Sequence, residues 1–304
     1  MAITRREALD LFQSDDLIGL GMEADRSRRS LHPENVVTYS LDQNIDGVHF
    51  GAINESGYEA IYVKLAETVD TGITAVRMQN FPSNLSIAKL EQMLQEIKQR
   101  FPQLSLRCFS AEEISAIAES NQLSLRETLR RLRDAGVDSI LGGGVSVTER
   151  WIEVHRTAHQ LGMRTVAAMV FGAGETIAQR VDQLEQLHSL QEVNGGFAAF
   201  VPLSFQPRTA AERGEEATAI EYLKFLAISR LYLDNIENIQ SSWAAQGLKV
   251  LQMGLRFGAN DVGSPVPEEN SAKFTTEEEL RRVIRDAGFR PVQRDALYRT
   301  VILN

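Results

Sequence analysis

The residues best suited to proton transfer lie just after segments that the sequence pattern predicts to be strands. They are one hydroxyl and four carboxylates: Ser110, Glu112, Glu175, Asp261 and Glu269. Carboxylates in different surroundings can divide acid and base roles, because burial and neighbouring charge separate their pKa values. We expect these five residues to carry any catalysis. A glutamate beside a helix start is equally explained as a helix cap, and loop acids are usually solvated.

A second group of residues has the character of a ligand site. The glycine run Gly142–Gly144 has no side chains and precedes a predicted helix. Its backbone could bind a carboxylate, phosphate or ribose by close approach. Alternatively, it could form a tight turn that lets the helix pack. Phe171 and Phe200 could stack on a flat ligand or pack in the core. The full predicted set is Gln79, Asn80, Gly142, Gly143, Gly144, Phe171, Phe200, Ser241, Arg256, Asn260 and Asn270.

These residues have to be positioned by the strands that precede them. Short apolar or β-branched runs alternate with longer amphipathic segments, which is typical of βα units. The pattern therefore predicts the α/β class and a (β/α)8 TIM-type barrel, in which loops at the carboxyl ends of the strands line the mouth. The predicted strands are Val36–Leu41, Ala75–Met78, Leu104–Phe109, Ser139–Leu141, Arg164–Val170, Phe197–Pro202, Asn238–Ser241 and Gly254–Phe257.

Helical periodicity fills the segments between these strands. We predict an N-terminal helical extension over residues 1–35 and, because no linker or composition shift divides the chain, a single domain over residues 1–304. Thr275 with Glu278 predicts a capping box at the start of the last helix. The predicted helices are Tyr58–Thr71, Ile87–Arg100, Ala111–Asn121, Leu125–Ala135, Thr148–Leu161, Thr176–Val193, Ala217–Leu233 and Thr275–Ala287.

Net charge and the distribution of apolar residues indicate which kinds of partner the chain is unsuited to bind. The chain has 304 residues and a formal net charge of −9, which argues against nucleic acid or an anionic membrane surface as a general partner. No apolar run approaches the roughly 20 residues that span a bilayer, and the amino terminus lacks the apolar core of a secretory signal. We therefore expect no membrane span and a cytoplasmic location.

Residue types that bind metals are scarce. The single cysteine, Cys108, can form neither an internal disulfide nor a multi-thiolate site. His155 and His159 stand four residues apart on a predicted helix, but no HExxH pattern surrounds them. We expect no metal site.

Several segments, taken together and in order, resemble a known family over nearly the whole chain. They are Leu31–Pro33, Val37–Tyr39, Phe109–Ile114, Asp138–Gly144, His155–His159, Phe171–Glu175, Gly195–Phe197, Phe200–Pro202, Arg256–Ser264 and Glu268–Asn270. These segments resemble the radical S-adenosylmethionine (SAM) enzymes of the futalosine route to menaquinone, the family of dehypoxanthine futalosine cyclase and aminofutalosine synthase. The resemblance implies a radical-SAM-type barrel that holds a small molecule.

The chain departs from the family pattern where the family binds its cofactors. The family carries a CxxxCxxC loop after its first barrel strand, and three thiolates there hold a [4Fe–4S] cluster to which SAM binds. Residues 44–54 take that place here and contain no cysteine. Gln79–Pro82 replaces the family's Gly-rich turn for the amino group of SAM, and Val145–Val147 shortens a later loop. We therefore expect no cofactor and no [4Fe–4S] cluster, with SAM retained at most as an intact ligand.

Three functions follow from these observations. The first is an enzyme that performs non-radical chemistry, as a lyase, isomerase or hydrolase, on a nucleoside-like or aromatic carboxylate ligand in the barrel. The second is a non-catalytic or regulatory protein that associates with a homologous active enzyme. The third is a protein that uses SAM intact. The identity of a small molecule released from protein purified from its native cells would choose among them.

Overall fold

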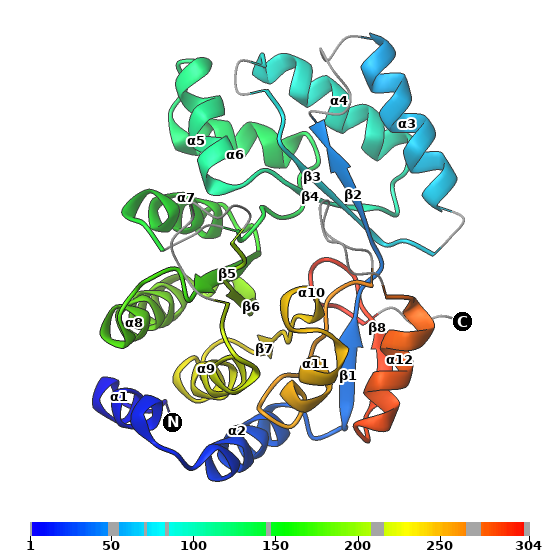
Figure 1. Cartoon of the computed structure of the whole chain (residues 1–304). Coiled ribbons are helices and arrows are strands. Elements are labelled where there is room, and N and C mark those ends of the chain that lie inside the picture. Colours follow the sequence, from blue (N-terminus) through cyan, green and yellow to red (C-terminus); the bar gives the residue numbers. More distant parts are fainter. Residues whose placement is uncertain are drawn as a thin grey trace.

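The strands gather around a common centre and the helices lie outside them (Figure 1). The computed structural model describes residues 2–47, 55–69, 72–82, 85–143, 147–207, 216–265 and 275–300. Within this part the strands form parallel sheets with the orders β1–β8, β2–β3–β4 and β5–β6–β7. The strands are β1 (Val36–Tyr39), β2 (Asp42–Asp46), β3 (Ala75–Gln79), β4 (Ser105–Cys108), β5 (Thr165–Phe171), β6 (Phe197–Ser204), β7 (Asn238–Ile239) and β8 (Arg290–Gln293).

The helices cover the outside of this ring. None in the described part of the chain is both long and apolar enough to cross a bilayer. They are α1 (Arg5–Gln13), α2 (Leu17–Leu31), α3 (Glu55–Val69), α4 (Ile87–Arg100), α5 (Ala111–Ser120), α6 (Leu125–Asp134), α7 (Glu149–Gln160), α8 (Ile177–Asn194), α9 (Ala219–Tyr232), α10 (Trp243–Gln246), α11 (Leu248–Gly254) and α12 (Glu277–Asp286).

Two irregular segments join the sheets into a closed ring. Between β4 and β5, the amide of Cys108 donates to the carbonyl of Ser139 (3.0 Å) and the amide of Ala168 donates to the carbonyl of Gly142 (3.1 Å). On the other side, Asp261 forms parallel bridges with both Thr38 and Gln240. The ring therefore closes through backbone that is not itself regular strand, and the predicted α/β TIM-type barrel is confirmed.

Most predicted helices agree with the structure, whereas several strands differ. The predicted helix over Ile87–Arg100 has the observed bounds. The predicted strand over Ser139–Leu141 is wrong, because this segment forms only an isolated bridge between Ser139 and Arg107 and is otherwise irregular. The predicted strand over Gly254–Phe257 is wrong, because this segment is the end of α11 and the turn after it. β2 and β8 were not predicted, and the capping box of α12 uses Thr276 with Glu279, one residue later than expected.

The predicted N-terminal extension consists of α1 and α2, which pack on the outside of the ring against α8 and α9. α1 begins with a capping box between Thr4 and Glu7, in which each side chain accepts a hydrogen bond from the other residue's amide. Lys224 of α9 then donates to the carbonyls of Phe12 and Ser14 at the end of α1. These contacts attach the extension to the barrel helices.

Two histidines are buried where α7 packs on β5. His155 is fully buried and His159 nearly so, and both bond to the hydroxyl of Thr165, through Nδ1 at 3.0 Å and Nε2 at 2.8 Å respectively. Nε2 of His155 and Nδ1 of His159 have no hydrogen-bond partner within the described chain. Burial, helped by the neighbouring His159, lowers the pKa of His155 well below its usual value, and burial lowers the pKa of His159 to about 4.

The histidine pair predicts a loss of stability in mild acid. Because the folded-state pKa values are lowered, the unfolded chain binds more protons below about pH 6.5, and stability falls as the pH drops from there toward 4. The shift of His159 alone corresponds to about 3 kcal/mol. Urea denaturation at several pH values would measure the slope, which His159→Gln should flatten. His188→Gln, on α8, is the matched control, and equal slopes for these two variants would contradict the prediction.

Candidate functional site

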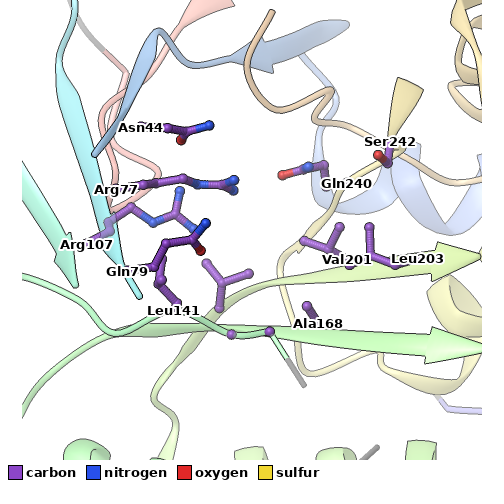
Figure 2. Close-up of a pocket in the computed structure, with 13 residues that line it drawn as sticks. Asn44, Arg77, Gln79, Arg107, Leu141, Ala168, Val201, Leu203, Gln240 and Ser242 are labelled. Atoms are coloured by element: carbon purple, nitrogen blue, oxygen red, sulfur yellow. The ribbon is translucent and has the colours of Figure 1, made fainter. Parts of the chain in front are cut away.

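A cavity of about 180 Å³ lies inside the ring of strands. Figure 2 shows polar side chains on one wall, from β2, β3 and β4, and the apolar Val201 and Leu203 on the wall opposite, where Gln240 and Ser242 also lie. The polar wall consists of Asn44, Arg77, Gln79 and Arg107. Barrel interiors are normally filled by branched apolar side chains, so two arginines inside the ring indicate a binding site.

Strand register places these polar groups side by side. Asn44 pairs with Arg77 between β2 and β3, and Arg77 pairs with Arg107 between β3 and β4. Side chains at one register position project to the same side of a parallel sheet, and alternate residues project to the other side. Met78 and Cys108, the residues that follow the two arginines in their strands, are fully buried in the core. The two guanidinium groups project toward the cavity (Figure 2).

Arg107 is the most unusual member of this wall. It is only 4% exposed, its Nε has no hydrogen-bond partner in the described chain, and its nearest carboxylate oxygen, on Asp42, is 3.6 Å from Nη1. Burial and the neighbouring positive charge of Arg77 lower the pKa of Arg107. A buried guanidinium N–H without a hydrogen-bond partner costs free energy, and an anion bound at this wall of the cavity would offset the burial of the charge.

Arg294 and Asp261 form a second, fully paired set beside the cavity wall. Both side chains are buried, and Arg294 donates through Nε and Nη2 to the two carboxylate oxygens of Asp261. The guanidinium carbon of Arg294 lies 3.7 Å from the ring centre of Tyr298. The hydroxyl of Tyr298 donates to Gln240, which lines the cavity (3.4 Å).

The wall opposite the arginines combines apolar and polar side chains. Val201 and Leu203 of β6 lie there, and Gln240 and Ser242 lie on the same side (Figure 2). The apolar residues Leu141, Val166 and Ala168 complete the lining. A flat hydrocarbon surface would bury apolar area here while a charged end reached the arginines. Paired guanidinium groups bind carboxylates through charge-assisted hydrogen bonds, so the arrangement suits a molecule that has one acidic end and one apolar face.

Three of the predicted ligand residues line this cavity: Gln79, Gly142 and Gly143. The two glycines differ in what surrounds them. A Cβ on Gly142 would lie 1.8 Å from the carbonyl oxygen of Val166, whereas a Cβ on Gly143 would meet nothing within 4 Å. Gly142 is therefore needed for close packing of backbone against β5, and Gly143 leaves open space at the cavity.

The four predicted catalytic residues that the structure describes are not among the residues that line the cavity. Ser110 caps α5, and Glu112 is exposed in the first turn of that helix. Glu175 accepts hydrogen bonds from Arg180 and from the amide of Gly172. Asp261 is held by Arg294, and Glu269 lies outside the described residues. A catalytic role for these five stays a prediction.

Six further predicted ligand residues are described by the structure, and none of them is among the residues that line the cavity. Phe171 and Phe200 are fully buried and pack on Phe225. Asn80 donates to the carboxylate of Asp46, and Ser241 is fully buried.

Two of these residues support loops outside the cavity. Arg256 donates to the carbonyl of Ala287 and lies over the ring of Phe289. Asn260 accepts a hydrogen bond from Arg230. Gly144 and Asn270 lie outside the described residues.

The sequence reasoning missed Asn44, Arg77, Arg107, Gln240 and Ser242, all of which line the cavity. A signal was present for the two arginines, because each stands between apolar residues inside a strand, in Val76–Met78 and Leu106–Cys108. A charged side chain at such a position either faces solvent or points into the barrel. Helices cover the outer face of the strands in such a barrel, so this side chain has to point into the barrel interior.

The donor set does not fit a three-thiolate cluster. The chain has one cysteine, Cys108, and its side chain is buried in β4. Within the described ranges no three His, Cys, Asp or Glu side chains come together as a metal site. Burial, with the neighbouring Asp138 and Glu113, raises the pKa of the Cys108 thiol well above its ordinary value, which disfavours the thiolate that binds metals.

Comparison with known proteins gives consistent matches. Residues 194–303 match the family described as the CofH/MqnC C-terminal region. The chain is 33% identical to a cyclic dehypoxanthine futalosine synthase of Streptomyces coelicolor, over 99% of this chain and 86% of the relative. It is 33% identical to the synthase of that name from Halalkalibacterium halodurans, over 98% and 91%. A crystal structure of methylornithine synthase matches with a TM-score of 0.70 and 15% identity, over 96% of this chain and 94% of that one, and supports the fold alone.

Proposed function

The chain belongs to the futalosine-pathway family of radical SAM enzymes, and on this basis we propose that its barrel binds a small molecule with a carboxylate on a flat apolar body. In this proposal Arg77 and Arg107 hold the carboxylate, and the apolar wall formed by β5 and β6 packs against the rest of the molecule. The observation that carries the proposal is Arg107, a buried guanidinium at a cavity whose Nε has no hydrogen-bond partner in the described part of the chain.

Family membership corrects one expectation from the sequence. We expected no cofactor and no [4Fe–4S] cluster, but the relatives and the structural neighbours are radical SAM enzymes, so that expectation was wrong to exclude the family's cofactors. The single buried cysteine does not fit the three thiolates of such a cluster. No chemical step at this site is therefore derived through it.

The side chains that line the cavity are better suited to binding a ligand than to catalysing its conversion. Among the described residues that line it there is no carboxylate, imidazole, thiol or amine, the groups that most often move protons in enzymes. This observation favours the second candidate function, a non-catalytic binding protein. Non-radical chemistry on the bound molecule, and association with a homologous enzyme, stay predictions.

Binding of benzoate tests the proposal. Benzoate combines one carboxylate with a flat apolar ring, and its neutral counterpart benzamide has nearly the same shape. We expect ligand-observed NMR titration to detect benzoate binding but not benzamide binding. Arg107→Gln should weaken benzoate binding by about tenfold or more, because a charge-assisted hydrogen bond is lost. Arg77 remains beside the buried carboxylate of Asp42 in this variant, and urea denaturation followed by circular dichroism checks that the variant is folded at the temperature of the titration.

Arg256→Gln is the matched control. It removes the same charge from a residue that contacts Ala287 and Phe289 away from the cavity lining, so benzoate affinity should stay unchanged. Equal effects of the two substitutions would overturn the proposal, as would equal binding of benzoate and benzamide.

A further inference from the structure

Gln240 brings a side-chain amide to the cavity on the wall opposite the two arginines (Figure 2). Such an amide offers two donor and two acceptor positions. Within the described part of the chain its side chain makes one hydrogen bond, a long one of 3.4 Å that Oε1 accepts from the hydroxyl of Tyr298. Most of the hydrogen-bonding capacity of Gln240 is therefore left for a molecule in the cavity.

The backbone around Gln240 fixes where this amide lies. The main-chain amide of Gln240 donates to the carbonyl of Phe200 (2.9 Å), and the residue forms a parallel bridge with Asp261. Gly263 has a φ of 70°, and a Cβ there would lie 2.6 Å from Nε2 of Gln240. Glycine at position 263 therefore leaves the space that the side-chain amide occupies.

Tyr298 orients the amide from the turn that follows β8. Its φ is 63°, in the left-handed region that bulky residues rarely adopt. The carboxylate of Asp295 holds this turn by accepting hydrogen bonds from the amides of Leu297 (2.8 Å) and Arg299 (2.9 Å). Burial raises the pKa of Tyr298 to about 12, so its hydroxyl stays a donor near neutral pH. Backbone strain of this kind is often found beside functional sites.

Ser242 adds a hydroxyl to the same wall (Figure 2). It is 8% exposed, and its amide donates to the hydroxyl of Tyr222 (2.8 Å), which fixes its backbone. Ser242 is the N-cap residue of α10, but its side chain makes no capping hydrogen bond. A serine at this position normally accepts from a helix amide, as Ser110 does at the start of α5. The hydroxyl of Ser242 is therefore available to a molecule in the cavity.

We propose that Gln240 and Ser242 are specificity-determining residues, and that they bind a neutral hydrogen-bonding group of the ligand, such as a hydroxyl or a carboxamide. Tyr298 is a positioning residue that acts through Gln240. The inference rests on the proposed carboxylate binding at Arg77 and Arg107. It assigns the ligand to flat carboxylic acids with a neutral polar substituent away from the carboxylate. An apolar edge at this place would leave the amide and the hydroxyl without partners, which is unfavourable.

Pairs of substituted benzoates with matched size test this recognition. They are 3-hydroxybenzoate with 3-methylbenzoate, and 4-hydroxybenzoate with 4-methylbenzoate. We expect ligand-observed NMR titration of the native chain to show, for at least one ring position, about tenfold tighter binding of the hydroxyl compound. Burial of apolar area alone would favour the methyl compound, so a preference for the hydroxyl requires hydrogen-bond partners in the cavity.

Variants identify which side chains produce the preference. Gln240→Leu replaces the amide by an apolar side chain and should shift the ratio of the two affinities by about tenfold toward the methyl compound. Tyr298→Phe and Ser242→Ala each remove one hydroxyl and should shift the ratio by about threefold in the same direction. Gln92→Leu makes the first substitution at an exposed residue of α4 and should leave the ratio unchanged.

The inference is overturned if the native chain binds benzoate but binds the methyl compounds as tightly as the hydroxyl compounds at both ring positions. This result does not depend on the folding of any variant. Folded Gln240→Leu and Gln92→Leu proteins with the same ratio would also overturn it, and an unchanged ratio in Tyr298→Phe would reject the positioning role. Failure of the native chain to bind benzoate would instead reject the proposed function, and the inference with it.

Discussion

Asp261→Asn is expected to lower the free energy of unfolding by about 3–5 kcal/mol, because it leaves the buried guanidinium of Arg294 without its counter-charge. The carboxylate accepts four hydrogen bonds: two from Arg294, one from the hydroxyl of Thr38 (2.6 Å) and one from the amide of Gly263 (2.9 Å). Asp261 also bridges Thr38 and Gln240 at the closure of the ring, so its loss would weaken the barrel seam. Urea denaturation followed by circular dichroism measures the change.

Two further variants identify the cause of this destabilisation. Adding Arg294→Met to Asp261→Asn should recover part of the lost stability, since it removes the unpaired buried charge. Asp134→Asn, which removes an exposed carboxylate, should change stability by less than about 0.5 kcal/mol. An Asp261→Asn protein with unchanged stability would contradict the structural role of this carboxylate.

The helices could be predicted well because their signals are local. An apolar period near 3.6 residues and a capping residue at the start define a helix without reference to the rest of the chain. Thr176 caps α8 and Ser124 caps α6 as their sequence context indicates. Glycines that closely follow a helix in the sequence have positive φ, as helix C-caps often do: Gly72, Gly136, Gly162 and Gly288.

The short strands were harder, because their identity depends on partners far along the chain. Leu255–Phe257 has the apolar character of a buried strand, but the ring is closed at this place by Asp261, which lies in a polar and glycine-containing segment. β8 pairs with β1 through contacts between residues more than 250 positions apart, such as Val36 with Arg290. No local pattern contains that information.

The cavity was missed for a related reason. The prediction placed functional residues after the strands, where loops line a barrel mouth, and so found Gln79, Gly142 and Gly143 but passed over Arg77 and Arg107 within the strands. Polar residues after strands are common and often have local structural roles: Ser110 caps α5, and Glu175 accepts a hydrogen bond from the amide of Gly172 in the turn before α8. A charged residue flanked by buried apolar neighbours in a strand is rarer, and here it is the more informative signal.

Gly142→Ala is the second substitution with a large expected effect, a loss of about 3 kcal/mol or more of unfolding free energy. The new Cβ would lie 1.8 Å from the carbonyl oxygen of Val166, 2.6 Å from its carbonyl carbon and 3.1 Å from the amide nitrogen of Ala168. These atoms are backbone, so a change of rotamer cannot relieve the contact. The segment would have to move away from β5 and break the hydrogen bond from the amide of Ala168 to the carbonyl of Gly142, which closes the ring.

Gly143→Ala is an adjacent control for that experiment, since a Cβ there meets nothing within 4 Å and should change stability by less than about 0.5 kcal/mol. Urea denaturation of the two variants separates the two interpretations of the glycine run. A large loss for Gly142→Ala alone means that this glycine lets strands approach, while Gly143 borders the ligand space. Equal stability of the two variants would mean that the segment after β4 can slide along β5, and the ring would then not depend on this contact for closure.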